Sequence, residues 1–576
     1  AVFSSDALSS VAYATEEILL VLTLAGTAMV GYSIPLSLSI IGLLVILTMS
    51  YRQIIFEYPE GGGAYIVGKS NLGEWPGLVA AGALMIDYVL TVAVSVAAGI
   101  AALTSAFPDL LAHREALCVA AILLVTVVNL RGVRESGQFF AVPTYIFIGT
   151  LTAMLGVGAI QILLGHATRI EPLPSLTPTE PLTLFLLLRA FSSGCTALTG
   201  VEVISNGVSA FKKPEAKNAA FTMIGMAVIL GTLFIGISAM AYYFGIVPKS
   251  DETVVSQIAR ATFGTGLLYF LVQASTMTIL ILAANSSFNG FPRLASILAR
   301  DSYMPHQMSM MGDRLVFSNG VIILGVFSCL LIILFNGDTH ALIPLYAVGV
   351  FLSFTISQAG MVKRWLVKKG PHWEKKLLVN GIGAVTTAIA TVIIASTKFA
   401  HGAWIVIVLI PMLIMFFKAI RSHYKAVSEQ VALSRGHRPP LPRRNIVVLP
   451  IGGVNRAVIR AVDYARSRSG DIRAVLVDVD PEETARVEIQ WAQWGCGVPL
   501  TVLPSPYRSV LSSLLDYLEQ VLQKDQECWV TVVIPEILPA RWWQNILHNQ
   551  RAFMLKGALL FKDRVILTDV PYHLTR

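Results

Sequence analysis

Carboxyl and hydroxyl side chains stand inside segments of this sequence that are otherwise apolar enough to cross a bilayer. Asp6, Glu16 and Glu17 all lie within the first such segment, residues 2–27. Because an isolated acid at the centre of a bilayer costs about 2.5–3.5 kcal/mol, such groups mark ion paths or ligand sites. The serines around Asp6 are poor helix formers whose hydroxyls compete for backbone groups. This composition predicts a helix that breaks within the membrane and exposes its backbone to a solute.

A second group of polar side chains lies in the third apolar segment, residues 75–107. Tyr88, Thr91 and Ser95 fall at i, i+3 and i+7, so their oxygen atoms line one stripe of a helix. Small polar residues also serve helix packing in membranes, and Thr91 and Ser95 alone would favour that interpretation. The neighbouring Asp87, together with Tyr88, favours a ligand site instead.

The sixth segment, residues 182–211, repeats features of the first. Residues 191–194 (FSSG) resemble residues 3–6 (FSSD), and Thr199 with Glu202 resembles Thr15 with Glu16. The copies are five segments apart, an odd number, so they would cross the membrane in opposite directions. An inverted repeat of five helices places two broken helices opposite each other at the midplane. The similarity is short, and an accidental match stays an alternative.

Two further stretches could line the path of a solute. Residues 57–65 (EYPEGGGAY) contain three glycines, which fit either a tight turn or a gate, and the GK[ST] of a phosphate loop is absent. In the tenth segment, Pro344 leaves a backbone carbonyl without its helical partner, and Tyr346 supplies a hydroxyl. A tyrosine in this position, taken alone, is more often a packing residue.

Composition places the chain in a membrane. Of its 576 residues, 55% are hydrophobic and only 14% are charged, and the mean hydropathy is +0.67. Apolar runs near the ~20 residues that span a bilayer recur through most of the chain. We therefore predict an all-α polytopic membrane protein surrounded by lipids. The twelve predicted spans are residues 2–27, 35–55, 75–107, 117–130, 141–164, 182–211, 220–244, 267–290, 318–334, 341–362, 379–395 and 404–420.

The distribution of charge predicts the orientation. Lys and Arg gather in alternate loops, as in cytoplasmic loops of plasma-membrane proteins, so both termini are expected in the cytoplasm. This asymmetry largely explains the net charge of +8, and no basic, aromatic-interleaved face indicates nucleic acid. The five cysteines have no CxxC spacing, which argues against a zinc site or a disulfide framework. Because the chain begins inside its first apolar segment, we expect further cytoplasmic residues before it.

The C-terminal residues follow a soluble pattern in which strands and helices alternate. The β-rich runs are residues 446–450, 474–479, 500–503, 530–534 and 565–568. The helical stretches are residues 456–467, 482–493, 510–523 and 542–553. This alternation predicts a parallel, doubly wound sheet. We expect a membrane domain at 1–425, a linker at 426–444 with a stiff proline-rich stretch, and a cytoplasmic α/β domain at 445–576.

Three motifs in this order resemble the amino acid, polyamine and organocation superfamily: residues 4–13 (SSDALSSVAY), 59–65 (PEGGGAY) and 197–202 (ALTGVE). Within it, the chain is similar to the KUP/KimA-type potassium uptake transporters over nearly its whole length, including residues 343–351 (IPLYAVGVF). The resemblance implies a LeuT-like core of two inverted five-helix repeats plus two further helices. It also implies proton-coupled potassium uptake without enzyme activity, and a homodimer joined through the cytoplasmic domains.

The same resemblance implies the residues of the cation path. In such transporters these are acids, tyrosines and hydroxyl residues on the first, third, sixth and tenth helices. In this sequence the positions are occupied by Asp6, Tyr13, Asp87, Tyr88, Thr91, Ser95, Thr199, Glu202 and Tyr346.

The C-terminal domain resembles the universal stress protein fold. However, residues 535–539 (PEILP) stand where the glycine-rich ATP signature is expected after the fourth strand, which argues against ATP binding. Relatives are controlled by cyclic di-AMP, and this domain is the expected place for that regulatory ligand. No other cofactor is implied.

Oxygen ligands that hold potassium weakly at several points let the ion leave as well as enter. The predicted potassium ligands are Asp6, Tyr13, Tyr88, Thr91, Ser95, Thr199 and Tyr346. Asp87 and Glu202 are expected to carry protons or to act as secondary cation ligands, since a buried carboxyl can change protonation when a cation leaves. Glu16 and Glu17 lie nearer the outer mouth and are expected to be vestibule or gate residues.

Two other functions stay open. An amino acid permease of the same fold would bind the substrate carboxylate with free amides of a broken first helix, and Asp6 would repel that carboxylate. A nucleotide sensor that uses its membrane part only as an anchor would have no reason to keep intramembrane acids at such a cost. The potassium hypothesis therefore fits the residues best.

Overall fold

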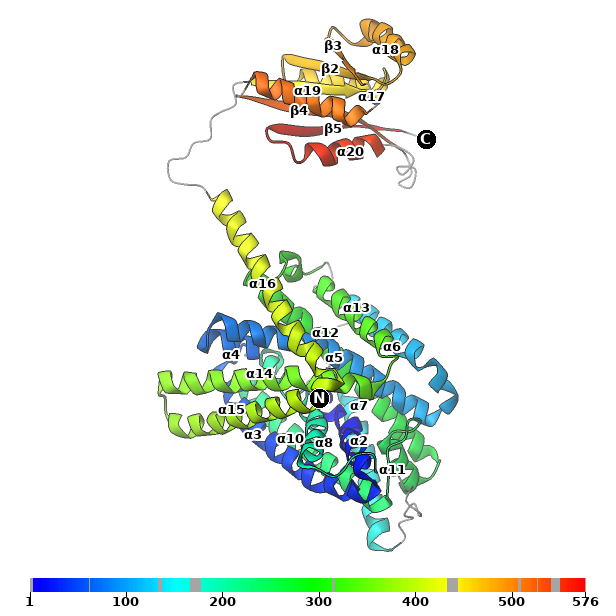
Figure 1. The fold of residues 1–576 in the computed structure, drawn as a ribbon, viewed down its shortest axis with the longest axis vertical. Coiled ribbons are helices and arrows are strands. Elements are labelled where there is room, and N and C mark those ends of the chain that lie inside the picture. Colours follow the sequence, from blue (N-terminus) through cyan, green and yellow to red (C-terminus); the bar gives the residue numbers. More distant parts are fainter. Residues whose placement is uncertain are drawn as a thin grey trace. The chain divides into compact units, whose positions relative to one another are not determined.

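The computed structural model describes residues 4–61, 63–132, 137–165, 178–312, 316–432, 444–505, 509–525, 527–539 and 550–574. Its contacts divide the chain into two compact units, Ala1–Ala432 and Leu433–Arg576. The described part of the first unit is helical, and the second combines helices with a sheet (Figure 1). Each unit is considered by itself.

The first unit is built from long apolar helices. Among the described residues, eleven helical segments are long and apolar enough to cross a membrane, and the seventeen-residue Ser318–Leu334 is a shorter apolar helix. Every predicted span overlaps one of these segments. The α-helices of this unit are α1 Ser5–Ser9, α2 Val11–Leu22, α3 Ser33–Glu57, α4 Ala64–Asn71, α5 Glu74–Ala106, α6 Arg114–Leu130, α7 Gly137–Leu163, α8 Leu184–Gly194, α9 Val203–Asn206, α10 Glu215–Phe244, α11 Val254–Phe263, α12 Leu267–Arg300, α13 Ser318–Leu334, α14 Thr339–Lys368, α15 Trp373–Thr397 and α16 Ala403–Val431.

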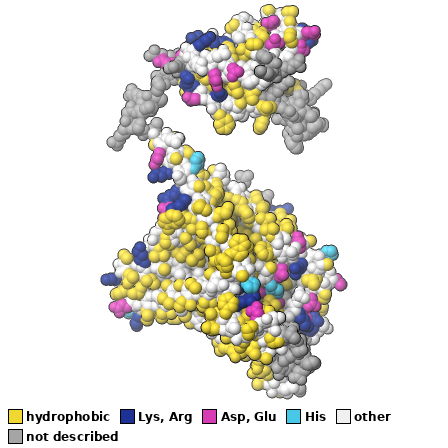
Figure 2. Space-filling view, viewed as in Figure 1, with side chains coloured by type: hydrophobic (Ala, Val, Ile, Leu, Met, Phe, Trp, Pro, Cys, Tyr) yellow, Lys and Arg dark blue, Asp and Glu magenta, His cyan; other side chains and the backbone are white. Residues whose placement is uncertain are grey.

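The outer faces of these helices are apolar. Leu124, Val392 and Met415 are each about two-thirds exposed, at 65%, 68% and 66%. Hydrophobic side chains cover most of the visible face of the unit in Figure 2, and charged side chains lie at its left and right edges and in one patch near the middle. Inside, one continuous apolar core runs through the whole bundle. A surface of this kind suits the hydrocarbon of a bilayer, where no water is available to polar groups.

Two central helices are interrupted, to different degrees. α1 and α2 are separated by Ser10 alone, which keeps helical angles (φ −62°, ψ −22°), so the predicted break in the first span is slight. The sixth span is fully broken: α8 ends at Gly194, Thr199 is extended, and α9 begins only at Val203. Gly200 takes a φ of +79° at this break, a conformation that glycine adopts at no steric cost.

The short helix α11 lies between α10 and α12 in the sequence. Seven of its residues are buried, and it packs against α2, α7, α10 and α12. The Thr253 hydroxyl caps its start by accepting the Ser256 N–H across 3.3 Å. Most of α11 is therefore packed against the bundle.

The second unit contains a five-stranded parallel sheet in the order β3-β2-β1-β4-β5. The strands are β1 Arg444–Ile451, β2 Asp471–Asp478, β3 Leu500–Pro504, β4 Cys528–Leu538 and β5 Val565–His573. The helices are α17 Arg456–Arg466, α18 Pro481–Trp494, α19 Val510–Lys524 and α20 Gln550–Leu559. One apolar core includes residues of α17 and α18, and a second includes residues of α19 and α20, so helices cover both faces. The predicted parallel α/β sheet is confirmed.

The boundaries of some elements differ from the sequence predictions. β4 extends to Leu538 and pairs with β5 along residues 530–538, so the PEILP stretch belongs mostly to a strand. α16 continues to Val431, so the first residues of the predicted linker, 426–431, are helical. No proline or glycine interrupts the helix there. The proline-rich part of the linker, and residues 542–549 of the last predicted helix, lie outside the described residues.

Candidate functional site

Asp6 lies at the centre of the first unit with only 5% of its surface exposed. From α12, Ser286 donates its hydroxyl hydrogen to Asp6 Oδ2 across 3.1 Å. From the broken sixth span, Gly200 approaches so closely that a Cβ there would come within 2.8 Å of Asp6 Cγ. The glycine therefore lets two interrupted segments touch at the carboxylate.

Serine hydroxyls bind the backbone of these same segments. Ser9 donates to the Asp6 carbonyl across 2.7 Å, and Ser10 donates to the Ala7 carbonyl across 2.6 Å. The Ser10 oxygen also lies 3.0 Å from the carbonyl of Ala197 in the sixth span. The serines predicted to compete for backbone groups thus connect the two interrupted segments.

Four hydroxyl groups from four separate segments meet beside Asp6. Thr91 on α5 donates to the Tyr346 hydroxyl on α14 across 2.9 Å. Thr199, at the break of the sixth span, lies within hydrogen-bonding reach of both Tyr13 on α2 and Tyr346. All four side chains are buried. This arrangement provides several neutral oxygen atoms next to one carboxylate.

Two further carboxyl groups lie near the first. Asp87 and Glu202 are both buried, and their charges lie close enough to interact with each other and with that of Asp6. Glu202 Oε2 accepts a hydrogen bond of 3.4 Å from Ser353 on α14. Among the described residues, Asp87 Oδ1 and Glu202 Oε1 have no hydrogen-bond partner. Three ionised acids in one buried region would repel one another, so protons or cations are needed to neutralise them.

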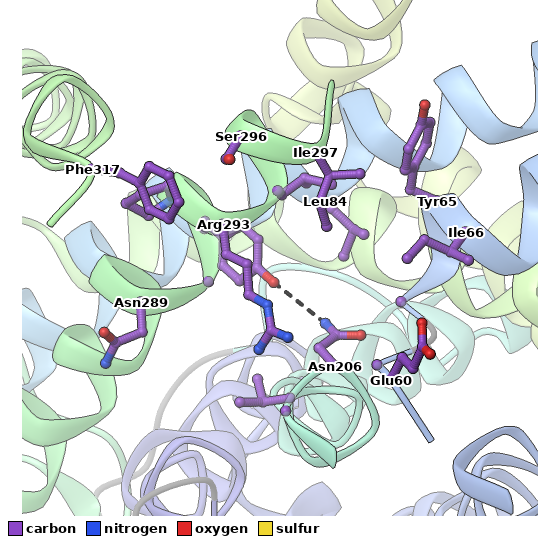
Figure 3. Close-up of a pocket in the computed structure, with 18 of the residues that line it drawn as sticks. Glu60, Tyr65, Ile66, Leu84, Asn206, Asn289, Arg293, Ser296, Ile297 and Phe317 are labelled. Carbon is purple, nitrogen blue, oxygen red and sulfur yellow. Dashed lines mark hydrogen bonds between the residues drawn. The ribbon is translucent and has the colours of Figure 1, made fainter. Parts of the chain in front are cut away.

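A cavity of about 1090 Å³ leads from one side of the bundle to this region (Figure 3). Its wall includes Ser286, the hydrogen-bond partner of Asp6, and Tyr88. Asn206 donates its side-chain hydrogen to the Tyr88 hydroxyl across 3.3 Å, and this bond is drawn in Figure 3. Arg293 points into the same space and donates to Ser209. A small solute in the cavity would therefore reach the carboxylates past Tyr88 and Asn206.

The glycine-rich stretch lies against Asn206 at the wall of this cavity. A Cβ on Gly61 would come within 2.8 Å of the Asn206 carbonyl oxygen, and one on Gly63 within 2.9 Å of Asn206 Oδ1. Gly61 also has a φ of +101°. These glycines are needed so that the turn after α3 can approach the end of the broken helix.

The structure brings together Asp6, Tyr13, Asp87, Thr91, Thr199, Glu202 and Tyr346, and places Tyr88 between them and the cavity. Ser95 is buried one turn beyond Thr91 on α5. The sequence reasoning missed Ser286, Ser353 and Asn206. Their only signal was a polar residue within an apolar helix or at its end, which packing residues share.

No group of His, Cys, Asp and Glu with the geometry to hold a metal ion occurs in the part of the chain that the structure describes. All five cysteines are free.

Comparisons with known proteins identify the family of the chain. A sequence model described as amino acid permease matches residues 1–417, and one described as KimA potassium transporter C-terminal domain matches residues 443–572. The potassium transporter KimA of Bacillus subtilis (strain 168) is 46% identical over 576 residues, which is 100% of this chain and 95% of that protein. The chain belongs to the KimA family of potassium transporters. The resemblance drawn from the three motifs is confirmed, and membership of this family excludes an enzyme.

Weaker matches are to other transporters. The human Asc-type amino acid transporter 1 is 24% identical over 343 residues, which is 58% of this chain and 64% of that protein. A solved manganese transporter from Eremococcus coleocola is 12% identical, with 75% of this chain and 95% of that chain covered and a TM-score of 0.36. The amino acid permease match over most of the chain assigns the first unit to that transporter fold.

Proposed function

We propose that this protein imports potassium through the space between its two interrupted helices, with Asp6 as the charged ligand. The observation that carries the proposal is the convergence of the Asp6 carboxylate with hydroxyls from four separate segments. Potassium is selected by oxygen atoms that replace its water shell and hold it weakly enough to let it go. Neutral hydroxyls beside a single acid have this character.

The neutral ligands are Tyr13, Thr91, Thr199 and Tyr346, with Tyr88 at the cavity end and Ser95 one turn further along α5. Thr91 and Tyr346 already bond to each other, so their oxygen atoms are held ready at one place. Replacing that mutual bond by contacts to an ion needs only small rotations of the two side chains. Binding would be weak for this reason, which suits an ion that must leave again.

Asp87 and Glu202 carry the protons that drive uptake. Each has one buried oxygen atom without a hydrogen-bond partner among the described residues. A buried carboxylate oxygen of this kind is stabilised by a proton or by a cation. Because the charges of Asp6, Asp87 and Glu202 interact, potassium at Asp6 together with protons on Asp87 and Glu202 leaves this buried region without net charge. The neutral state that crosses the membrane therefore contains both ions, which couples their movement in one direction.

The cavity beside Tyr88 releases the ion to the cytoplasm. Arg293 and Arg300 line it, and Lys69 lies on α4 next to it, which fits the excess of positive residues on the cytoplasmic side of membrane proteins. Both termini are then cytoplasmic. The interrupted helices belong to inverted five-helix repeats of a LeuT-like core, with α15 and α16 as the two further helices, and access alternates as the repeats rock.

The second unit regulates the first. The match of residues 443–572 to the C-terminal domain of the KimA family supports a role specific to these transporters. We propose that it has a universal-stress-protein-like fold, that it joins two copies into a homodimer and that it receives cyclic di-AMP. The functional parts are then a transporter domain at 1–425, a linker at 426–444 and a regulatory domain at 445–576.

Growth of a bacterium that lacks potassium uptake tests the transport proposal. The wild type should restore growth at limiting potassium, whereas Asp6→Asn and Glu202→Gln should not. The control Asp109→Asn, which changes an exposed acid in the short 3-10 helix Pro108–His113, should behave as the wild type. Rescue that both Asp6→Asn and Glu202→Gln leave unchanged would contradict the assignment of these residues.

Reconstituted vesicles separate the rival functions. Potassium uptake that an inward proton gradient accelerates supports proton symport, and Glu202→Gln should remove that acceleration. Uptake of a neutral amino acid without potassium uptake would instead support an amino acid permease. Vesicles that accumulate no solute, from protein whose C-terminal unit binds a nucleotide, would support the sensor hypothesis.

A further inference from the structure

A cluster of charged side chains lies on the side of the site opposite the cavity. Its members are Glu16 and Glu17 on α2 and His340 on α14. The Nδ1 atom of His340 is 2.6 Å from Glu17 Oε1, and the Nε2 atom is 3.6 Å from Glu16 Oε1. Both ring nitrogens therefore face a carboxylate, so one imidazole bridges two acids of α2.

Glu16 also holds a third segment. Its Oε2 atom accepts the N–H of Val254, the first residue of α11, across 3.2 Å. A carboxylate at this position is favoured by the partial positive charge of a helix N-terminus. The cluster therefore joins α2, α11 and α14, which are far apart in the sequence.

The cluster lies beside the C-terminal part of α5, beyond the proposed cation site. Tyr88 lines the large cavity, whereas Thr104 and Ser105 line a small cleft of about 50 Å³ together with Glu16 and His340. Tyr88 and Thr104 are sixteen residues apart in α5, about 24 Å at 1.5 Å per residue. Thr91, a ligand of the site, lies between them. The cavity side is open, and the side of the cluster is nearly closed.

The two acids of the cluster are buried, and side chains that can carry positive charge lie near them. Glu16 and Glu17 are 4% and 5% exposed, and the His340 side chain is 39% exposed. Lys398, at the end of α15, is 3% exposed, and its charge interacts with that of Glu17. Acids at such depth persist only when paired. Movement of α2 away from α14 would separate these pairs and admit water to them.

We propose that Glu16, Glu17 and His340 form a latch, here called the outer latch, that keeps the outer side closed and must separate before potassium enters. Alternating access requires the outer half of α2 to move relative to α14, and the outer latch is the contact between them that carries charge. The outer latch thus sets how often the transporter opens outward. This inference rests on the proposed transport function, because the outer latch is said to control the entry of potassium. The labelling test that follows does not require potassium transport.

Labelling of Thr104→Cys by a membrane-impermeant thiol reagent, applied to the outside of cells, measures outward opening directly. Thr104 is 3% exposed in the closed cleft, and the protein without this cysteine gives the background from the natural ones. Adding Glu17→Gln or His340→Gln should speed labelling at least threefold. Adding Glu180→Gln, which breaks the ion pair with Arg189 instead, should not. Equal rates in all four proteins would overturn the outer latch. Because labelling needs no potassium, it gives an answer even if the transport proposal fails.

A zinc bridge tests the same contact by locking it closed. Glu17→His would face His340, and two imidazoles with a nearby carboxylate bind zinc. External zinc should reduce potassium uptake by this variant at least tenfold, and EDTA should restore it. The wild type and the double variant Glu17→His with His340→Ala should be unaffected. Uptake by Glu17→His that zinc leaves unchanged, or equal inhibition of the double variant, would contradict the proposal.

Discussion

Gly200 offers a demanding test of the site because its side chain is a single hydrogen atom placed against Asp6. Gly200→Ala adds one methyl group and changes no charge and no hydrogen-bonding group. The new Cβ would lie within 2.8 Å of Asp6 Cγ and of the Ala7 backbone nitrogen, and 3.1 Å from the Asp6 carbonyl carbon. Contacts below 3 Å to backbone atoms cannot be relieved by a side-chain rotation, so α1 and the sixth span must separate.

Two costs add at this position. The φ of +79° costs a non-glycine residue about 1–2 kcal/mol. Overpacking of a tightly filled site costs about 1–3 kcal/mol more. If the segments separate instead of bearing this strain, Asp6 moves away from Thr199, Tyr346 and their hydroxyls. A penalty of even 1.4 kcal/mol on the loaded state lowers its population about tenfold.

Potassium uptake by reconstituted vesicles measures the result. Gly200→Ala should lower the uptake rate at limiting potassium at least tenfold. The matched control is Gly225→Ala in α10, where no atom lies within 4 Å of the new Cβ, and it should transport as the wild type. If Gly200→Ala transports like this control while both proteins are equally stable in detergent, close contact of the two segments at Asp6 is not needed, and the reasoning is refuted.

Further predictions follow from other contacts. Thr91→Val and Tyr346→Phe should each raise the potassium concentration for half-maximal uptake. Because the two side chains share one hydrogen bond, the loss of binding free energy in the double variant should be about 0.5–3 kcal/mol smaller than the sum of the two single losses. Additive losses would argue against a shared ligand pair. Asn206→Ala loses a hydrogen bond to Tyr88 that is worth about 0.5–1.5 kcal/mol. It should speed potassium efflux from preloaded vesicles by up to tenfold. Unchanged efflux would show that Asn206 is not part of the potassium path. Trp491→Phe loses its 2.8 Å bond to a backbone carbonyl and should speed hydrogen exchange of β2 and β3 about 5–30-fold with uptake unchanged; unaltered exchange would contradict the importance of that bond.

The carboxyl residues of the site and the hydroxyl stripe of α5 could be predicted because they contrast with their surroundings, whereas Tyr13 and Tyr346 were implied as ligands by the family resemblance. An acid such as Asp6 in an apolar helix is costly enough to require a purpose, and helical spacing placed Thr91 on the stripe where it meets Tyr346. The parallel sheet was predictable for a similar reason, since alternating strands and helices leave few other topologies.

Other parts of the site depended on tertiary contacts that no local pattern encodes. Ser286 and Ser353 look like ordinary packing residues, and only the crossing of α12 and α14 brings them to Asp6 and Glu202. The break at Ser10 is slighter than predicted, because its hydroxyl bonds to a carbonyl one turn back and the helical angles persist. The sixth span breaks fully where Gly200 supplies a positive φ.

Potassium binding to the purified protein, followed by calorimetry, tests the central claim most directly. The wild type and the surface control Asp109→Asn should bind potassium with the same affinity. Asp6→Asn keeps the shape of the side chain and a group that can bond to Ser286, but it removes the charge. It should therefore weaken binding at least tenfold, since a charge pair about 4 Å apart is worth about 4 kcal/mol at an effective dielectric of 20, before the cost of desolvation. Binding by Asp6→Asn as tight as that of the wild type would contradict the proposal that potassium is held at this carboxylate.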